Sequence, residues 1–164
     1  MTNIRHANTD NISNISKALA TSWRTVYRGI IADDYLDQVP DDRWVNFLNH
    51  AFDTNSNTVI VMEDEEKIIG VAIYNQTENK QECSLGCFYL LPKEIGKGLG
   101  HILYEYIESD FKDKGFKSCI IDVLENNTRA INFYTKHGYI DTGKETPVKL
   151  GNKEYICKLL EKEL

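Results

Sequence analysis

Apolar residues in the first third of the chain recur at a helical period. The positions that share this spacing are Ile12, Ile15, Leu19 and Trp23, and they predict a helix over residues 10–26. Asp33–Val39 predicts a short second helical turn that ends at Pro40, because proline cannot continue a helix. Asp41 is placed to cap a third helix. The apolar face of that helix would carry Trp44, Phe47, Leu48, Ala51 and Phe52.

The middle of the chain changes to the pattern of β-strands. β-Branched and apolar runs at Thr58–Met62 and Ile68–Tyr74 flank the acidic turn Glu63–Lys67, which predicts a hairpin. A third run, Glu82–Leu91, is closed by Pro92. We therefore expect three successive strands here.

Helical spacing then returns. Its apolar stripe consists of Leu99, Ile102, Leu103, Tyr106, Ile107 and Phe111. Gly115 is placed to end this helix, and Cys119–Leu124 predicts a buried strand. Asn127 can cap a further helix that ends near Gly138. Two closing strands are expected near Tyr139–Lys144 and Glu154–Leu160. No repeat or linker interrupts the pattern, so residues 1–164 predict a single α+β domain in which strands outnumber helices.

The composition limits the kinds of partner that we expect. The chain has 164 residues, 41% of them hydrophobic, which suffices for one core. It has no apolar run of signal-peptide or membrane-spanning length, so we expect a soluble, cytoplasmic protein without a membrane partner. A net charge of -6 argues against a nucleic-acid partner. The cysteines, Cys83, Cys87, Cys119 and Cys157, show no C-x-x-C spacing, which favours free core thiols over zinc or disulfides, and no metal is expected.

A glycine-rich turn joins the third predicted strand to the following helix. In Leu90–Gly100 the glycines allow close approach of a ligand, and the free N–H groups of the helix start favour an anion. The spacing matches neither a P-loop nor G-x-G-x-x-G. A flexible turn that binds nothing is the alternative, but the strand-to-helix context favours a phosphate cradle.

Two motifs resemble those of the GNAT superfamily of N-acetyltransferases. The family's (Q/R)-x-x-G-x-(G/A) falls on Ile95–Gly100, and its N-x-R-A-x-x-F-Y-x-K-x-G-(F/Y) falls on Asn127–Tyr139 without a gap. Ile95 departs from the usual Gln or Arg, which removes one side chain but not the backbone cradle. The resemblance, over Glu82–Tyr139, implies a mixed, mostly antiparallel sheet of about six or seven strands with splayed central strands and about four helices.

The resemblance implies transfer of acetyl from acetyl-coenzyme A, as co-substrate, to a primary amine by direct attack in a ternary complex. The residues that it assigns to the cofactor are Leu90, Leu91, Ile95, Gly96, Lys97, Gly98, Leu99, Gly100, Asn127, Phe133 and Lys136. The acceptor would be a small-molecule or peptide amine, and assembly as a homodimer stays open. There are two alternatives. One is a non-catalytic module that binds or senses acyl-coenzyme A, and the other is a partner-binding domain with an incidental glycine turn.

Two residues are candidates for catalysis. By the resemblance, Tyr134 stands next to the thioester sulfur, although core packing would also explain an aromatic residue on this stripe. Glu82 is the candidate base that deprotonates the amine, because histone-modifying members have a glutamate at this distance before the glycine turn. A solvated charge at the start of a strand is the alternative for Glu82. A covalent route through Cys87 lacks a neighbouring histidine.

The acceptor site is expected near the first helix. Trp23–Ile31 is similar to the W-x-x-x-Y-R-G stretch of a bacterial GNAT subgroup, in which this helix and loop contribute to the acceptor site. Tyr27 and Arg28 are therefore the candidate acceptor-binding residues, whereas core packing explains Trp23. Polyamines, aminoglycosides, amino acids and protein amines all remain open as acceptors.

Overall fold

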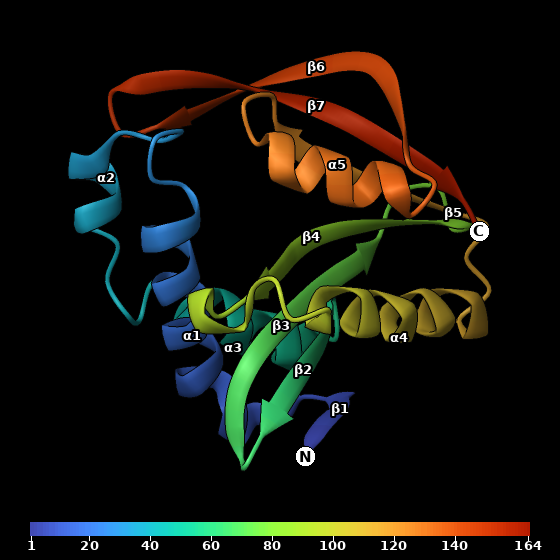
Figure 1. Ribbon diagram of the computed structural model, residues 1–164. Helices are drawn as coiled ribbons and strands as arrows, with labels where there is room; N and C mark the ends of the chain where they lie inside the picture. Colours follow the sequence, from blue (N-terminus) through green and yellow to red (C-terminus); the bar gives the residue numbers. More distant parts are fainter.

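The computed structural model describes all residues, 1–164, as one seven-stranded sheet with helices on both faces (Figure 1). The strands are β1 (Thr2–His6), β2 (Thr58–Asp64), β3 (Lys67–Gln76), β4 (Glu82–Leu90), β5 (Ser118–Leu124), β6 (Ile140–Leu150) and β7 (Lys153–Glu163). The helices are α1 (Ile12–Val26), α2 (Asp33–Asp37), α3 (Val45–Thr54), α4 (Leu99–Asp113) and α5 (Thr128–Lys136), with 3-10 turns η1 (Thr9–Asn11) and η2 (Pro92–Glu94). The predicted α+β class is confirmed.

The sheet is antiparallel except at its centre. Its strand order is β1-β2-β3-β4-β5-β7-β6, and β4 and β5 form its parallel pair. These two strands pair only between Glu82–Ser84 and Ser118–Ile120 and then diverge. The expected splay of the central strands is therefore present, and it opens toward the carboxyl end of β4.

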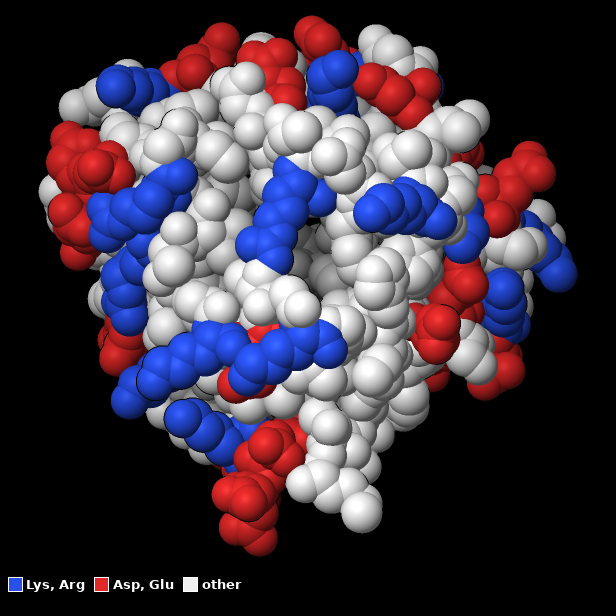
Figure 2. All heavy atoms as spheres, viewed as in Figure 1, with Lys and Arg blue, Asp and Glu red and all other residues white.

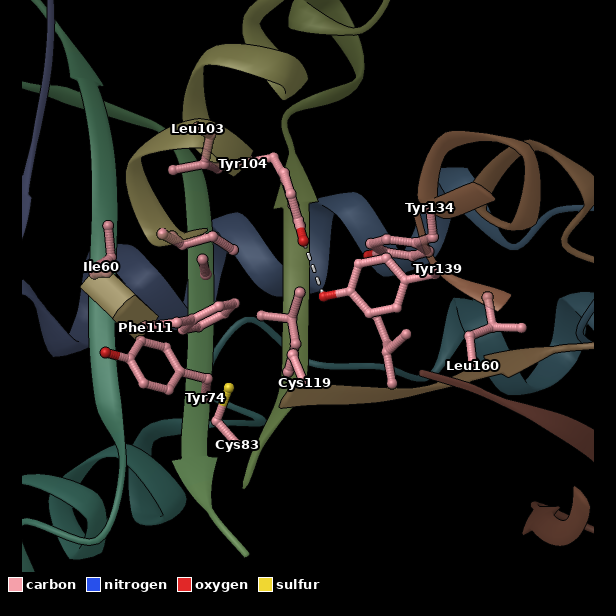
Figure 3. Packing of buried hydrophobic residues seen from close by; sticks show 14 of the residues in the cluster. Ile60, Tyr74, Cys83, Leu103, Tyr104, Phe111, Cys119, Tyr134, Tyr139 and Leu160 are labelled. Carbon is pink, nitrogen blue, oxygen red and sulfur yellow. Dashed lines mark hydrogen bonds between the residues drawn. The ribbon is translucent and has the colours of Figure 1, made fainter. Parts of the chain in front are cut away.

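Both faces of the sheet are packed, which explains why β3 is apolar almost throughout. Ile69, Ala72 and Tyr74 join the core beneath α4 and α5. Ile68, Val71 and Ile73 join a second core beneath α1 and α3. Figure 3 shows the first core, where the Tyr104 hydroxyl donates to the Tyr139 hydroxyl at 3.0 Å. No helix is long and apolar enough to cross a membrane.

The local predictions hold for most elements, with three differences. β1 was not predicted, and it pairs antiparallel with β2 at the edge of the sheet. β6 and β7 extend beyond the predicted strands because they pair with each other as far as Leu150 and Lys153. Asp41 does not cap α3: its carboxylate accepts a hydrogen bond from Arg24 at 2.7 Å, and α3 begins without a side-chain cap.

Candidate active site

The splay between β4 and β5 opens a cavity of about 650 Å³. β4 lines it with Gly86 and Phe88–Leu90, and β5 lines it with Ile121–Leu124. The rest of the lining comes from α1, the turn before α4, the start of α4, α5 and the β6–β7 hairpin. A volume of this order is typical of small-molecule sites.

The end of β4 keeps one backbone edge free of strand pairing. Cys87–Leu90 pair with β3 but not with β5, so an extended ligand can hydrogen-bond along this edge. The carbonyl of Leu90, which lines the cavity, accepts from the Ser22 hydroxyl at 3.1 Å. Leu91 lies outside the lining, and its N–H donates to Ile69 at 2.8 Å. The structure therefore places Leu90, but not Leu91, at the site.

The glycine turn presents a row of unpaired backbone donors. The N–H groups from Gly96 to Gly100 donate to no acceptor within the chain. Gly96 and Gly98 have φ of +86° and +80°, a conformation that L side chains rarely adopt, and a Cβ on either would meet no protein atom within 4 Å. This open space and these donors at the start of α4 fit a pyrophosphate.

Only some residues of this turn face the cavity. Ile95, Gly96, Gly98 and Gly100 line it, whereas Lys97 and Leu99 do not. The Lys97 ammonium pairs with Glu94 at 2.9 Å on the outer side of the turn. Lys97 and Leu99 can therefore contribute backbone N–H groups, but their side chains do not line the site.

α5 and its N-cap bring three of the predicted residues to the cavity wall. Asn127, Phe133 and Tyr134 line the cavity, while Lys136 is exposed outside it. Asn127 caps α5 as predicted, because its Oδ1 accepts from the Ala130 N–H at 3.2 Å. Its amide nitrogen has no partner in the chain and can donate to a ligand.

Tyr134 is deeply buried and still available for hydrogen bonding. Its side chain keeps 5% of its exposure, and its hydroxyl makes no hydrogen bond within the protein. Burial raises the pKa of this phenol well above its usual value, so the hydroxyl stays protonated. Tyr134 therefore belongs both to the core and to the cavity wall, and its free hydroxyl is a donor.

Glu82 lies away from the cavity. It occupies the start of β4, where β4 still pairs with β5, and its carboxylate accepts from the Thr77 hydroxyl at 2.9 Å. The cavity begins four positions later, at Gly86. The sequence separation from Ile95 placed Glu82 on the strand that leads to the glycine turn, but it did not reveal where β4 and β5 part. The structure does not bring Glu82 and Tyr134 together.

Only one of the two predicted acceptor residues lies at the cavity. Tyr27 lines the cavity, and its hydroxyl lies 2.7 Å from that of Tyr89. Arg28 points away and pairs with Asp33 at 3.2 Å and with Asp37 at 2.5 Å. The guanidinium is therefore engaged at the surface, and only Tyr27 of the pair contacts the site.

Asp122 and His101 are lining residues that were missed in the sequence, whereas Arg129, within the Asn127–Tyr139 motif, was a candidate for contact with the cofactor's phosphates. Asp122 follows an apolar run on β5, and this isolated charge was a signal that could have revealed it. Burial raises the pKa of Asp122, and its carboxylate forms no ion pair in the structure. Arg129 and His101 line the cavity from α5 and α4. Arg129 is unpaired, and Lys and Arg side chains gather around the hollow in Figure 2.

The cysteines are all free thiols in the structure. Cys157 lines the cavity and Cys87 does not. Burial raises the pKa of Cys87 to about 12 and also raises that of Cys157. Both thiols are therefore poor nucleophiles at neutral pH. No group of three or more His, Cys, Asp and Glu side chains is arranged to bind a metal.

A family model and a relative match this chain. The model of the acetyltransferase (GNAT) family matches residues 21–139. An uncharacterized N-acetyltransferase of Bacillus subtilis, YuaI, is 30% identical over 142 residues, which cover 82% of this chain and 78% of that protein.

Two solved structures share the fold. PaiA N-acetyltransferase from Thermoplasma acidophilum, in complex with coenzyme A, has a TM-score of 0.78 at 20% identity and covers 100% of this chain and 99% of its own. YncA from Salmonella typhimurium, with its cofactor acetyl-CoA, has a TM-score of 0.76 at 17% identity, with coverage of 100% and 94%. The chain belongs to the GNAT family of acetyltransferases.

Proposed function

We propose that the protein transfers the acetyl group of acetyl-coenzyme A to a primary amine by direct attack in a ternary complex. The observation that carries this proposal is the joint arrangement of the glycine turn and Tyr134. Unpaired N–H groups at Gly96–Gly100 lie at one end of the splay cavity, and the free Tyr134 hydroxyl lies on its wall. Such a site offers both a cradle for phosphates and a donor for a leaving sulfur.

The residues of the cavity fit the cofactor in two parts. The N–H groups of the glycine turn hold the pyrophosphate, with the unpaired Arg129 guanidinium adding a positive charge at the same mouth. The pantetheine arm follows the free edge of β4, where Asn127 can donate its amide N–H. Phe133 closes the apolar side of this channel.

An ammonium acceptor loses two protons in the reaction, one before its nitrogen attacks and one as the tetrahedral intermediate collapses. The amine nitrogen forms a bond to the acetyl carbonyl carbon, the carbon–sulfur bond breaks, and the sulfur leaves with the electron pair as a thiolate, which takes up one proton from water. Tyr134 donates a hydrogen bond to that sulfur. Full proton transfer from a phenol to a thiolate is uphill by about 2 kcal/mol at ordinary pKa values, and burial of Tyr134 raises its pKa further. Its contribution is therefore to stabilise developing charge.

We assign proton removal from the amine to Asp122 in place of Glu82. Asp122 is the carboxylate that lines the cavity, and it has no cation partner in the structure. Its raised pKa narrows the gap to the pKa of an amine, which is about 10.4 in water. The carboxylate binds the ammonium group first and then accepts its proton, directly or through a water molecule.

Initial-rate kinetics distinguish direct attack from the alternative mechanisms. With both substrates varied, direct attack predicts intersecting double-reciprocal lines, whereas an acetyl-cysteine intermediate predicts parallel lines. Binding of acetyl-coenzyme A without thiol release for any amine would instead support the sensing module. A failure to bind acetyl-coenzyme A at all would overturn the proposal.

A further inference from the structure

The acceptor half of the cavity differs in chemistry from the cofactor half. Its walls come from the end of α1, from β5 and from the β6–β7 hairpin. Figure 1 shows the tip of this hairpin beside α2 and the segment that follows α1. The side chains of this half are Trp23, Val26, Tyr27, Asp122, Leu124, Val148, Leu150 and Cys157. Apart from the Asp122 carboxylate, the Tyr27 hydroxyl, the Trp23 indole N–H and the Cys157 thiol, this wall is apolar.

Aromatic rings are grouped at the α1 side of this wall. The rings of Trp23 and Tyr27 meet edge to face with centroids 4.8 Å apart, and those of Tyr27 and Tyr89 lie 6.3 Å apart. The Tyr27 and Tyr89 hydroxyls bond to each other at 2.7 Å, which satisfies part of their polar capacity. The rings therefore offer a surface for an apolar or aromatic group.

A single carboxylate faces this half. Of the 24 residues that line the cavity, Asp122 is the one with an acidic side chain. It shares a face of β5 with Leu124, because alternate residues of a strand point the same way. On the neighbouring α2, Asp33 and Asp37 pair with Arg28, and Asp34 accepts from the Tyr35 N–H at 3.0 Å. The lining itself therefore offers a carboxylate to one ammonium group only.

The side chains of the cavity also disfavour an anionic acceptor. The Arg28 guanidinium, which lies nearest in sequence to Tyr27, is held by two aspartates. Arg129 and His101 line the cofactor half, next to the glycine turn. A carboxylate on the acceptor would thus meet apolar walls and Asp122 without a compensating cation.

From this arrangement we infer that the acceptor is a small monoamine with an apolar, aromatic-sized body, whose ammonium group binds Asp122 and whose body packs against Trp23, Tyr27 and Val148. This inference rests on the proposed acetyl transfer and adds the substrate class. It excludes as preferred acceptors the polyamines, the aminoglycosides and the free amino acids. Burial of one aromatic group favours such an acceptor by roughly tenfold or more.

The acceptor class is tested by measuring the release of free thiol from acetyl-coenzyme A by the full chain. The acceptors compared are 2-phenylethylamine, spermidine, kanamycin and glutamate. We expect kcat/KM for 2-phenylethylamine to exceed that for each of the others at least tenfold. A higher kcat/KM for any of the other three overturns the acceptor class and leaves the proposed transferase intact. No release with any amine overturns the proposed transfer, and the acceptor class with it.

A charge placed on the apolar wall tests the position of the acceptor. Val148→Asp adds a second carboxylate beside the cavity and should raise the spermidine to 2-phenylethylamine ratio of kcat/KM at least tenfold. Ile140→Asp makes the same charge change on β6, at a side chain that is 67% exposed and outside the lining, and should leave the ratio as it is. Leu150→Asp replaces Val148→Asp if circular dichroism shows that the latter does not fold. An unchanged ratio in the folded variant overturns the inference.

Discussion

Two glycines at opposite ends of α4 allow the phosphate cradle to be tested with a matched control. Gly98 precedes the helix and Gly115 follows it, with φ of +80° and +84°. A Cβ at either position meets no protein atom within 4 Å. Replacement of either by Ala therefore carries a similar backbone cost of about 1–2 kcal/mol in the free energy of unfolding. The two variants should be destabilised alike.

Their effects on the cofactor should differ, because only Gly98 lines the cavity. A methyl group there crowds phosphate oxygens that must come within about 3 Å of the backbone nitrogens. Loss of one hydrogen bond to a charged group costs about 1.5–3 kcal/mol, which is roughly a 10- to 150-fold increase in Kd. Gly98→Ala should show this increase for acetyl-coenzyme A, and Gly115→Ala should bind like the parent.

Isothermal titration calorimetry gives both dissociation constants, and urea unfolding shows whether the two variants are equally stable. Equal Kd values for folded Gly98→Ala, Gly115→Ala and the parent would refute the assignment of the glycine turn to the pyrophosphate. A similar loss of binding in both variants would also refute it, because the loss would then follow from the strain that they share.

Three further predictions concern the proposed reaction and the core. Tyr134→Phe should lower kcat roughly 10- to 100-fold with little change in KM for acetyl-coenzyme A. An unchanged kcat in steady-state assays would show that Tyr134 only packs in the core. Asp122→Asn should lower kcat/KM by roughly 10²-fold at neutral pH, and less as the pH approaches the amine pKa of about 10; a pH profile in which Glu82→Gln shows this pattern instead would restore Glu82 as the base. Phe111→Ala, which removes a fully buried ring packed 4.6 Å from that of Tyr74, should cost roughly 3–5 kcal/mol of unfolding free energy in urea titrations.

The elements with strong periodicity or a recognisable cap could be predicted from the sequence. The apolar stripe of α4, the hairpin of β2 and β3 and the Asn127 cap all depend on local spacing, and each is present. β1 was missed because its five residues include Arg5 and His6 and its pairing with β2 is a long-range contact. Strands that pair across the chain leave a weaker local signal than helices.

The same distinction between local spacing and long-range pairing applies to the candidate site. The glycine turn and the α5 residues follow from contiguous motifs, and the structure brings Gly98, Asn127 and Tyr134 to one cavity. Glu82 and Asp122 lie on neighbouring parallel strands, and which of them faces the cavity depends on where those strands separate. That point is fixed by tertiary pairing over three residue pairs and cannot be read from spacing along one strand.

The central claim is that the cavity transfers acetyl from acetyl-coenzyme A to an amine. Mass spectrometry of the purified chain incubated with acetyl-coenzyme A and 2-phenylethylamine measures both products of that transfer. We predict the N-acetylated amine in amounts equal to the free coenzyme A thiol, with both reduced in Tyr134→Phe. Free thiol without acetylated amine, or an acetyl group retained on a cysteine of the protein, would contradict the account.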